Sequence, residues 1–255
     1  MRFMTWNIQN GGGTRVDEIC RRIGESDPDV LALTEFRNTN EPVLRHRLAG
    51  LGYSHIATSK PEDRQNGLLV ASKHSLRETG ERIDYDGERW LPLRITDADI
   101  DVLTVHIPGA PDNKFAADGY GISGAARKER FWQQVLGYAR DHRDRPAVLI
   151  GDFNTGLRAD AEGAMFKMSH YLQALIDIGF IDTWRCLHPR AREYSWYSKR
   201  KDKQTAETQD HNGFRLDYVF VSPVLAASLE SAAILHGPRW DSISDHAPVV
   251  VDLKR

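Results

Sequence analysis

The sequence predicts an α/β fold in which two packed, mixed β-sheets are flanked by helices. Three observations support this prediction. Short apolar runs rich in β-branched residues, typical of buried strands, are the commonest pattern in the chain. Apolar residues at helical spacing lie between some of these runs. Residues 66–107 form consecutive strands with no helix between them, which argues for mixed sheets rather than a purely parallel barrel.

The elements follow in order along the chain. The predicted strands are residues 3–8, 30–34, 67–72, 90–96, 100–107, 147–150, 216–222 and 248–253. The predicted helices are residues 14–25, 41–51, 125–141 and 162–178. In the third of these helices, one apolar stripe is formed by Phe131, Val135, Leu136 and Ala139.

Composition limits the possible classes of protein. The 255 residues are 40% hydrophobic, enough for a sizeable core, and no repeat or Pro/Gly-rich linker divides them. We therefore expect one domain, residues 1–255. With 34 Lys and Arg against 36 Asp and Glu, the formal net charge of -2 creates no global attraction to nucleic acid or membrane. Any site for a polyanion must therefore be local.

The location of the protein is predicted from what the sequence lacks. The longest uncharged stretches, such as residues 218–229, are well short of the roughly 20 residues that span a bilayer. The first residues, MRFMTWNIQN, show no signal-peptide pattern, and Cys20 and Cys186 form neither a disulfide framework nor a metal motif. We expect a cytoplasmic protein with no membrane association and no obligate protein partner.

Polar side chains interrupt or follow the apolar strands, mostly at their carboxyl ends. This placement is typical of catalytic groups held on rigid elements. The residues are Asn7, Glu35, His106, Asp152, Asn154, Asp217, Asp245 and His246.

Each of these residues has a structural explanation when it is taken alone. The explanations are a turn at Asn7, a helix cap at Glu35, an Asx turn at Asp152, an ion pair of Asp217 with Arg215 and a satisfied core histidine at His106. A single metal and phosphate site explains all of them together. Carboxylate oxygens suit Mg²⁺ or Mn²⁺, and no Cys or His cluster favours zinc. The chemistry that fits is hydrolysis of a phosphate ester.

Six motifs carry a resemblance to a known family. MTWNIQNGG, LTEF, HIPG, IGDFNTG, GFRLDYVFVS and SDHAPVVVDL follow one another between Met4 and Leu253. In this order they resemble the endonuclease/exonuclease/phosphatase superfamily. The resemblance implies a two-sheet sandwich like that of deoxyribonuclease I, with the active site at one edge. It also implies Mg²⁺-dependent cleavage of phosphodiesters or phosphomonoesters.

The same resemblance implies roles at the metal and at the attacking water. Glu35 would be the principal metal ligand, with Asn7 near the metal and the phosphate. Asp245 would ligate the metal or support the site. Asp152 would position or deprotonate the attacking water, and Asn154 would hold phosphate.

Two histidines would contact phosphate oxygens. His246 would do so while oriented by Asp217. His106 occupies a place where the exonuclease III branch usually has Tyr, and it is more similar to the deoxyribonuclease I and sphingomyelinase branches. Gln9 stands where abasic-endonuclease relatives often have Asp. In contrast, FRLDYVFVS, SWYS and RKERFWQQVLGYAR resemble the exonuclease III and abasic-endonuclease branch.

A basic segment precedes Asp217. Residues 185–203 contain seven Lys or Arg and two acids, a local net charge of about +5, which suits binding of a nucleic-acid backbone. Aromatic side chains within it can stack on exposed bases. We predict substrate contacts at Trp196, Tyr197, Lys199, Arg200 and Lys201. The alternative is a solvated loop, extended by a long insertion at residues 199–213.

The sequence thus predicts a Mg²⁺-dependent or Mn²⁺-dependent DNA endonuclease or exonuclease, with a role in abasic-site or 3′-end processing and DNA repair. A small-molecule or phospholipid phosphodiesterase or phosphatase is the alternative enzyme, favoured by His106 and the near-neutral charge. A nucleic-acid-binding module that has lost catalysis is disfavoured, because no principal catalytic position carries an inert residue.

Overall fold

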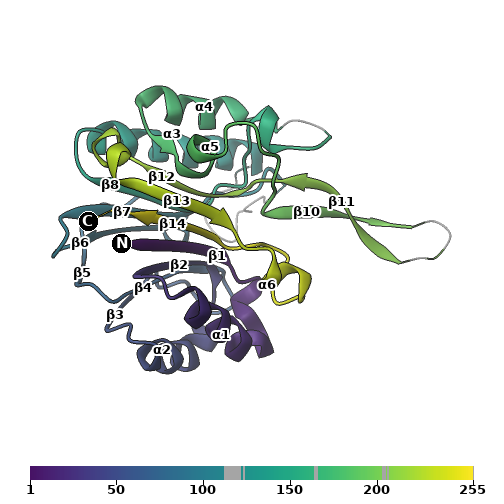
Figure 1. Cartoon of the computed structure of the whole chain (residues 1–255), viewed down its shortest axis with the longest axis horizontal. Coiled ribbons are helices and arrows are strands. Elements are labelled where there is room, and N and C mark those ends of the chain that lie inside the picture. Colours follow the sequence, from purple (N-terminus) through teal and green to yellow (C-terminus); the bar gives the residue numbers. More distant parts are fainter. Residues whose placement is uncertain (112–121, 123, 164–165, 203–204, 206, 255) are drawn as a thin grey trace.

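Two six-stranded sheets pack face to face, and helices cover their outer faces (Figure 1). The structure is a computed structural model and describes residues 1–111, 122, 124–163, 166–202, 205 and 207–254. Within this part of the chain, no helix combines the length and the hydropathy needed to cross a membrane.

The first sheet has the strand order β13-β14-β1-β2-β4-β3. Its strands are β1 (Arg2–Asn7), β2 (Val30–Phe36), β3 (His55–Thr58), β4 (Gly67–Ser72), β13 (Leu229–Ile234) and β14 (Val249–Leu253). Strands β1 and β2 are parallel, and the other neighbours are antiparallel.

The second sheet has the order β5-β6-β7-β8-β12-β9. Its strands are β5 (Leu76–Glu78), β6 (Trp90–Ile95), β7 (Ile100–His106), β8 (Ala147–Asp152), β9 (Ile181–Asp182) and β12 (Asp217–Val221). Only β7 and β8 are parallel among the pairs of this sheet in the described chain. The predicted sandwich of mixed sheets is therefore confirmed.

Side-chain alternation divides the apolar residues between three cores. In β2, Val30 and Ala32 face the second sheet, while Leu31 and Leu33 face the helices α1 (Val16–Ser26) and α2 (Glu41–Gly50). In β8, Val148 and Ile150 point inward, while Ala147 and Leu149 point outward. This outer core includes α3 (Gly124–His142) and α4 (Ser169–Ile178), and the predicted stripe of α3 is buried in it. Both faces of each sheet are thus covered, which explains the nearly continuous apolar runs.

The predicted helix over residues 162–178 is wrong at its start, because α4 begins at Ser169. Glu162 is held instead by the backbone of Gly213 through two hydrogen bonds. The Gly213 carbonyl accepts from the Glu162 N–H, and the Gly213 N–H donates to the Glu162 carboxylate. Gly163 has a φ of 76°, in the left-handed region, which does not continue a helix. Two short helices, α5 (Thr183–Leu187) and α6 (Gly237–Trp240), were not predicted.

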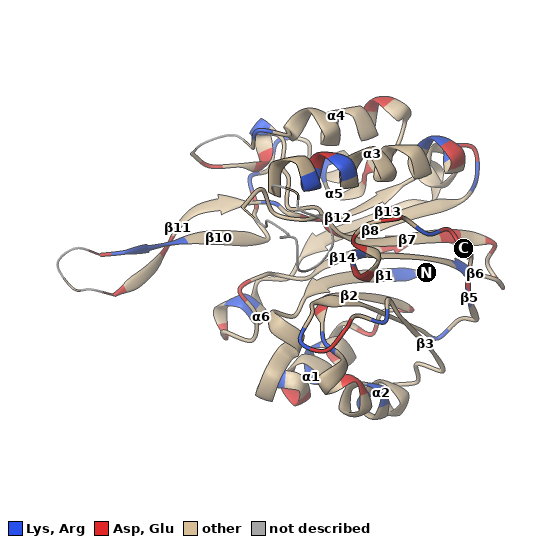
Figure 2. Cartoon of the chain, turned by 180° about the vertical axis from the view of Figure 1, so that it is seen from behind, with Lys and Arg blue, Asp and Glu red and all other residues tan. Residues whose placement is uncertain are grey.

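Strands β10 (Trp196–Lys201) and β11 (Thr208–Phe214) form an antiparallel hairpin that projects from the body of the protein (Figure 1). The segment for which a solvated loop was the alternative explanation is therefore a β-hairpin over its described residues. Figure 2 shows Lys and Arg gathered on its β10 strand, away from the body.

Candidate active site

The registers of the two sheets bring the predicted polar residues to one edge. Asn7 ends β1 opposite Thr34 of the parallel strand β2. His106 ends β7 opposite Asp152, which ends the parallel strand β8. Strand β12 runs antiparallel to β8, so it begins at this edge, with Asp217 opposite Asp152. Asn7, His106 and Asp152 thus end their strands at the edge where Asp217 begins the antiparallel strand β12, so residues far apart in sequence meet there.

Asn7 joins the two sheets across this edge. Its Nδ2 donates to Glu35 Oε1 (3.2 Å) in the first sheet and to Asp152 Oδ2 (3.0 Å) in the second. Its Oδ1 accepts a hydrogen bond from the backbone N–H of Gln9 (3.0 Å). The turn that Asn7 could form by itself is therefore present, and the same amide also bridges two carboxylates.

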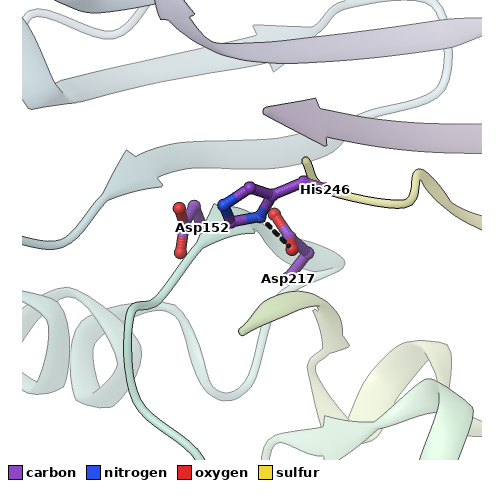
Figure 3. Close-up of side chains that lie close together, drawn as sticks. All are labelled: Asp152, Asp217 and His246. Carbon is purple, nitrogen blue, oxygen red and sulfur yellow. Dashed lines mark hydrogen bonds and ion pairs between the residues drawn. The ribbon is translucent and has the colours of Figure 1, made fainter. Parts of the chain in front are cut away.

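The imidazole of His246 lies between two carboxylates (Figure 3). Its Nδ1 is 2.8 Å from Asp217 Oδ2. One ring nitrogen of His246, one carboxylate oxygen of Asp217 and one of Asp152 lie within 4.8 Å of one another. All three side chains are buried. The alternative ion pair of Asp217 with Arg215 is wrong, because the guanidinium of Arg215 donates to Asp160 and Asp182.

Burial and neighbouring charges shift the ionisation of this group. Burial raises the pKa of Asp152 above its ordinary value, and the negative charge of Asp217 raises it further. Burial alone would lower the pKa of His246, but the charge and hydrogen bond of Asp217 outweigh it, and the pKa is raised. At neutral pH His246 is therefore an imidazolium, held between a carboxylate that orients it and one with enhanced affinity for a proton.

The pKa of His106 is shifted in the opposite direction from that of His246. Burial, together with the positive charge of Arg89, lowers the pKa of His106 well below its ordinary value, so the imidazole is neutral. Its Nε2 is 3.7 Å from Asp152 Oδ2, and its buried Nδ1 has no hydrogen-bond partner among the described residues. A satisfied core histidine would have one, so this geometry does not fit that alternative.

Asp152 also organises the turn that follows β8. Its Oδ1 accepts the backbone N–H of Asn154 (2.8 Å), as expected for an Asx turn, and Asn154 has a φ of 46°. The Asn154 side chain donates to the backbone carbonyl of Ile107 (2.9 Å), and the backbone carbonyl of Asn154 accepts from Lys128 Nζ. The turn thus uses one carboxylate oxygen of Asp152, while Oδ2 faces Asn7.

An open cleft of about 630 Å³ lies over these residues. Of the predicted catalytic and metal-binding residues, only Asp217 is not in its wall, because Asp217 lies behind His246. The residues that line the cleft are Asn7, Glu35, His106, Asp152, Asn154, Asp245 and His246, with Trp196 from the hairpin.

The cleft also contains residues that sequence reasoning missed. Among them are Asn66, Arg89, Lys128, Phe166 and Phe214. Arg89 directly precedes β6, which starts at the edge where β7 ends. A search for polar residues at both ends of each apolar strand could have found it. Lys128 lies on α3, and no local pattern separates it from a surface lysine, although it is only 3% exposed.

The oxygen atoms in the cleft suit a hard cation. Glu35 has a φ of 58°, and its Oε2 accepts the backbone N–H of Asn10 (2.8 Å). Asn10 and Gly11 also have positive φ, so this contact caps no α-helix. Asp245 Oδ2 accepts from Trp196 Nε1 (3.1 Å), and its other oxygen accepts no hydrogen bond from the described residues. Neither carboxylate is neutralised by an Arg or Lys in the described chain. Such oxygen donors, without a thiolate, fit Mg²⁺ or Mn²⁺.

The basic segment is divided by the structure. Arg185 belongs to α5 rather than to the hairpin, and its guanidinium donates to Asp160. The guanidinium of Arg239 lies over the ring of Tyr197 in a cation–π contact, 4.3 Å from the ring centroid. Lys199 pairs with Asp210 of the facing strand.

The remaining cations of this strand are more available. Arg200 and Lys201 are exposed on β10, while Lys203 lies outside the described residues. Of the five predicted substrate contacts, only Trp196 reaches the cleft wall.

Comparison with known proteins agrees with this geometry. The model of the Endonuclease/Exonuclease/phosphatase family matches residues 4–246. An exodeoxyribonuclease from Bacillus subtilis is 24% identical over 266 residues, which cover 98% of this chain and 98% of that protein.

Solved structures share the fold over the full length of both chains. An AP endonuclease from Archaeoglobus fulgidus has a TM-score of 0.81 at 22% identity. A 3′ phosphatase, NExo, from Neisseria bound to product DNA hairpin has a TM-score of 0.80 at 22% identity. The 3′-5′ exonuclease NExo from Neisseria meningitidis has 0.78 at 23%. With a family model that spans nearly all of its residues, the chain belongs to the endonuclease/exonuclease/phosphatase family and is a hydrolase of phosphate esters.

Proposed function

We propose that this protein is a divalent-metal-dependent DNA nuclease that cleaves a phosphate ester at a DNA end or an abasic site. The observation that carries the proposal is the buried group of Asp152, His246 and Asp217 at the floor of a cleft whose rim bears a basic hairpin. DNA repair in the cytoplasm is the cellular setting that this activity implies.

Asp152 is the proposed base. Its Oδ2 faces the cleft beside Asn7, and its raised pKa brings it closer to neutrality than an ordinary carboxylate. A general base is most effective when its pKa is near the operating pH. In the proposed step, Asp152 orients a water molecule and takes its proton as the water oxygen bonds to phosphorus.

His246 is the proposed donor to the phosphate. As an imidazolium it donates a hydrogen bond to a phosphate oxygen, whose negative charge grows as the water attacks and the bond to the leaving oxygen breaks. Asp217 fixes the ring through Nδ1 and leaves Nε2 for this contact. The neutral amide of Asn154 and the imidazole of His106 complete the proposed phosphate site without adding net charge.

The proposed metal ligands are Glu35 and Asp245, with Asn7 beside them. When bound there, Mg²⁺ or Mn²⁺ supplies a positive charge that neutralises the phosphate and stabilises the leaving oxygen. Asn7 holds Glu35 and Asp152 through one amide nitrogen, so it sets the spacing between the proposed metal ligand and the proposed base.

The shape of the protein supports nucleic acid as the substrate rather than a small diester. The hairpin extends beyond the cleft and carries exposed Arg200 and Lys201, which a small substrate in the cleft does not reach (Figure 2). Trp196 lies in the cleft wall, with its ring centroid 5.8 Å from that of Phe214. Such an aromatic pair can pack against an unstacked base or sugar. The names of the similar proteins, an AP endonuclease and a 3′ phosphatase bound to DNA, support the same class.

The experiment that tests this function compares substrates at equal concentration in Mg²⁺. Duplexes with an abasic site, a 3′ phosphate or an intact 3′ end are compared with a p-nitrophenyl phosphodiester and with a phospholipid. We expect a DNA substrate to have the highest kcat/KM by at least tenfold. Faster cleavage of the small diester or the lipid would refute the nuclease hypothesis in favour of the alternative, a small-molecule or phospholipid phosphodiesterase.

A further inference from the structure

Ser195 is a buried residue directly before Trp196, where the hairpin leaves the body of the protein. Its Oγ accepts hydrogen bonds from the backbone N–H groups of Leu216 (3.0 Å) and Asp217 (3.2 Å). Its carbonyl accepts the backbone N–H of Ala247 (2.7 Å). One residue therefore contacts the backbone on both sides of the pair formed by Asp217 and His246.

This position matters because the two members of the pair come from different sheets. Asp217 begins β12 of the second sheet, and His246 lies in the connection that leads into β14 of the first. Their side chains must nevertheless stay within hydrogen-bonding distance, at 2.8 Å. A tether that crosses from one sheet to the other removes the relative movement that would break this bond.

The hydrogen bonds made by the His246 backbone itself lead to β1 of the first sheet. Its N–H donates to Ser244 Oγ (3.2 Å), which in turn donates to the carbonyl of Asn7 (2.6 Å). Its carbonyl accepts from Trp6 Nε1 (3.0 Å). These bonds fix His246 to β1, but they do not fix it to Asp217. Ser195 supplies the backbone connection to the second sheet.

The same point of the chain reaches a third functional residue. Trp196 forms an isolated antiparallel bridge with His246, and its indole donates to Asp245. The two residues at the base of the hairpin thus contact the proposed metal ligand, the proposed phosphate donor and the carboxylate that orients it.

We propose that Ser195 is a positioning residue that holds Asp217 and His246 in register and joins the hairpin to the catalytic centre. This inference rests on the proposed function, in which His246 acts on the phosphate. Without Oγ, two buried N–H groups lose their acceptor, and the start of β12 is free to shift. Small displacements of a catalytic group lower turnover strongly, whereas the substrate contacts of the cleft and hairpin remain.

The test compares three variants of the full chain in saturating Mg²⁺. Ser195→Ala removes Oγ, and Ser195→Thr keeps it. The matched control is Ser222→Ala, at the other end of β12, where another buried serine accepts from Ala147 (3.1 Å) and donates to Arg145 (2.6 Å). For Ser195→Ala we expect kcat on DNA to fall on the order of tenfold to a hundredfold with KM changed less than threefold.

The controls separate positioning from general stability. Ser195→Thr is expected to retain kcat within about threefold of wild type, because its hydroxyl can accept the same bonds. Ser222→Ala is expected to lower the melting temperature by an amount similar to Ser195→Ala and to keep kcat. Wild-type kcat in Ser195→Ala, or an equal loss in Ser222→Ala, would overturn the inference.

A second measurement does not depend on turnover. In the ¹⁵N-labelled, metal-free protein, the Nδ1–H proton of His246 gives a downfield NMR resonance that is identified by its loss in His246→Ala. We expect this resonance to shift upfield or broaden in Ser195→Ala and to be unchanged in Ser222→Ala. An unchanged resonance in Ser195→Ala would refute the positioning role. If the wild-type protein cleaves no DNA, the proposed function fails, and this resonance still decides the role of Ser195.

Discussion

Removing the exposed cations of the hairpin should weaken DNA binding. It should also reduce, by a predictable amount, how steeply the affinity falls with salt concentration. Strand β10 carries Lys199, Arg200 and Lys201, but Lys199 already pairs with Asp210. Arg239 binds the same carboxylate. We therefore expect two free phosphate contacts rather than three, from Arg200 and Lys201.

The magnitude follows from counterion release. Each phosphate contact on duplex DNA contributes about 0.9 to the slope of log affinity against log salt, so Arg200→Ala with Lys201→Ala should flatten the slope by about 1.8. Between about 50 and about 200 mM salt, the parent should then lose about twelvefold more affinity than the double variant. Adding Lys199→Ala should change the slope by clearly less than 0.9, because it also frees the carboxylate of Asp210.

The assay is fluorescence anisotropy of a labelled duplex at several salt concentrations, with all variants built on His246→Ala to prevent cleavage. The control is Arg77→Ala with Lys254→Ala, which removes one exposed cation from β5 and one directly before the last residue. Strand β5 and the C-terminus lie at the end of the protein opposite the hairpin (Figure 1). The control should keep the parent slope. Identical slopes for the hairpin variant and the parent would show that the hairpin does not contact the DNA backbone.

Three further predictions concern the cleft. Chelation by EDTA should abolish hydrolysis, and Mg²⁺ or Mn²⁺ should restore it; full activity in chelator would disprove the metal requirement. Glu35→Ala should raise the Mg²⁺ concentration needed for half-maximal rate, whereas Asn154→Ala should lower kcat with little change in the metal titration; equal effects of the two variants on both measurements would contradict the assigned roles. Trp196→Ala should raise KM for abasic, gapped or single-stranded DNA more than for intact duplex, in which bases are not available for stacking; the same change on all substrates would place the ring outside the base-contacting surface.

The positions of the site residues could be predicted because catalysis and strand structure leave different marks on the sequence. A buried strand tolerates few polar residues, so Asn7, Glu35 and Asp152 stand out where their apolar runs end. The sequence could not supply the contacts between them. The bridge from Asn7 to Glu35 and Asp152 depends on how two sheets pack, and no local pattern records sheet packing.

Residues without such a contrast were missed. Strand β11 has the sequence TQDHNGF, which shows no apolar strand pattern. It is a strand because its backbone pairs with that of β10, a contact that the local sequence does not reveal. Lys128 is buried on α3 because the turn at Asn154 accepts its ammonium group, a contact that is made only in the folded chain. Ser195 is likewise one serine among many until β12 and β14 are in place.

If Asp217 and His246 act as one unit in phosphate ester hydrolysis, a double-mutant cycle will show their coupling directly. The turnover of Asp217→Asn, His246→Ala and the double variant is measured on one DNA substrate in saturating Mg²⁺. His246→Ala should lower kcat by on the order of a hundredfold or more, and Asp217→Asn should lower it less, because the imidazole remains. The double variant should be no slower than His246→Ala alone, since Asp217 acts through the ring that has been removed. Strictly additive losses would show that the two residues act independently, and a kcat near that of wild type in His246→Ala would exclude His246 from the chemical step.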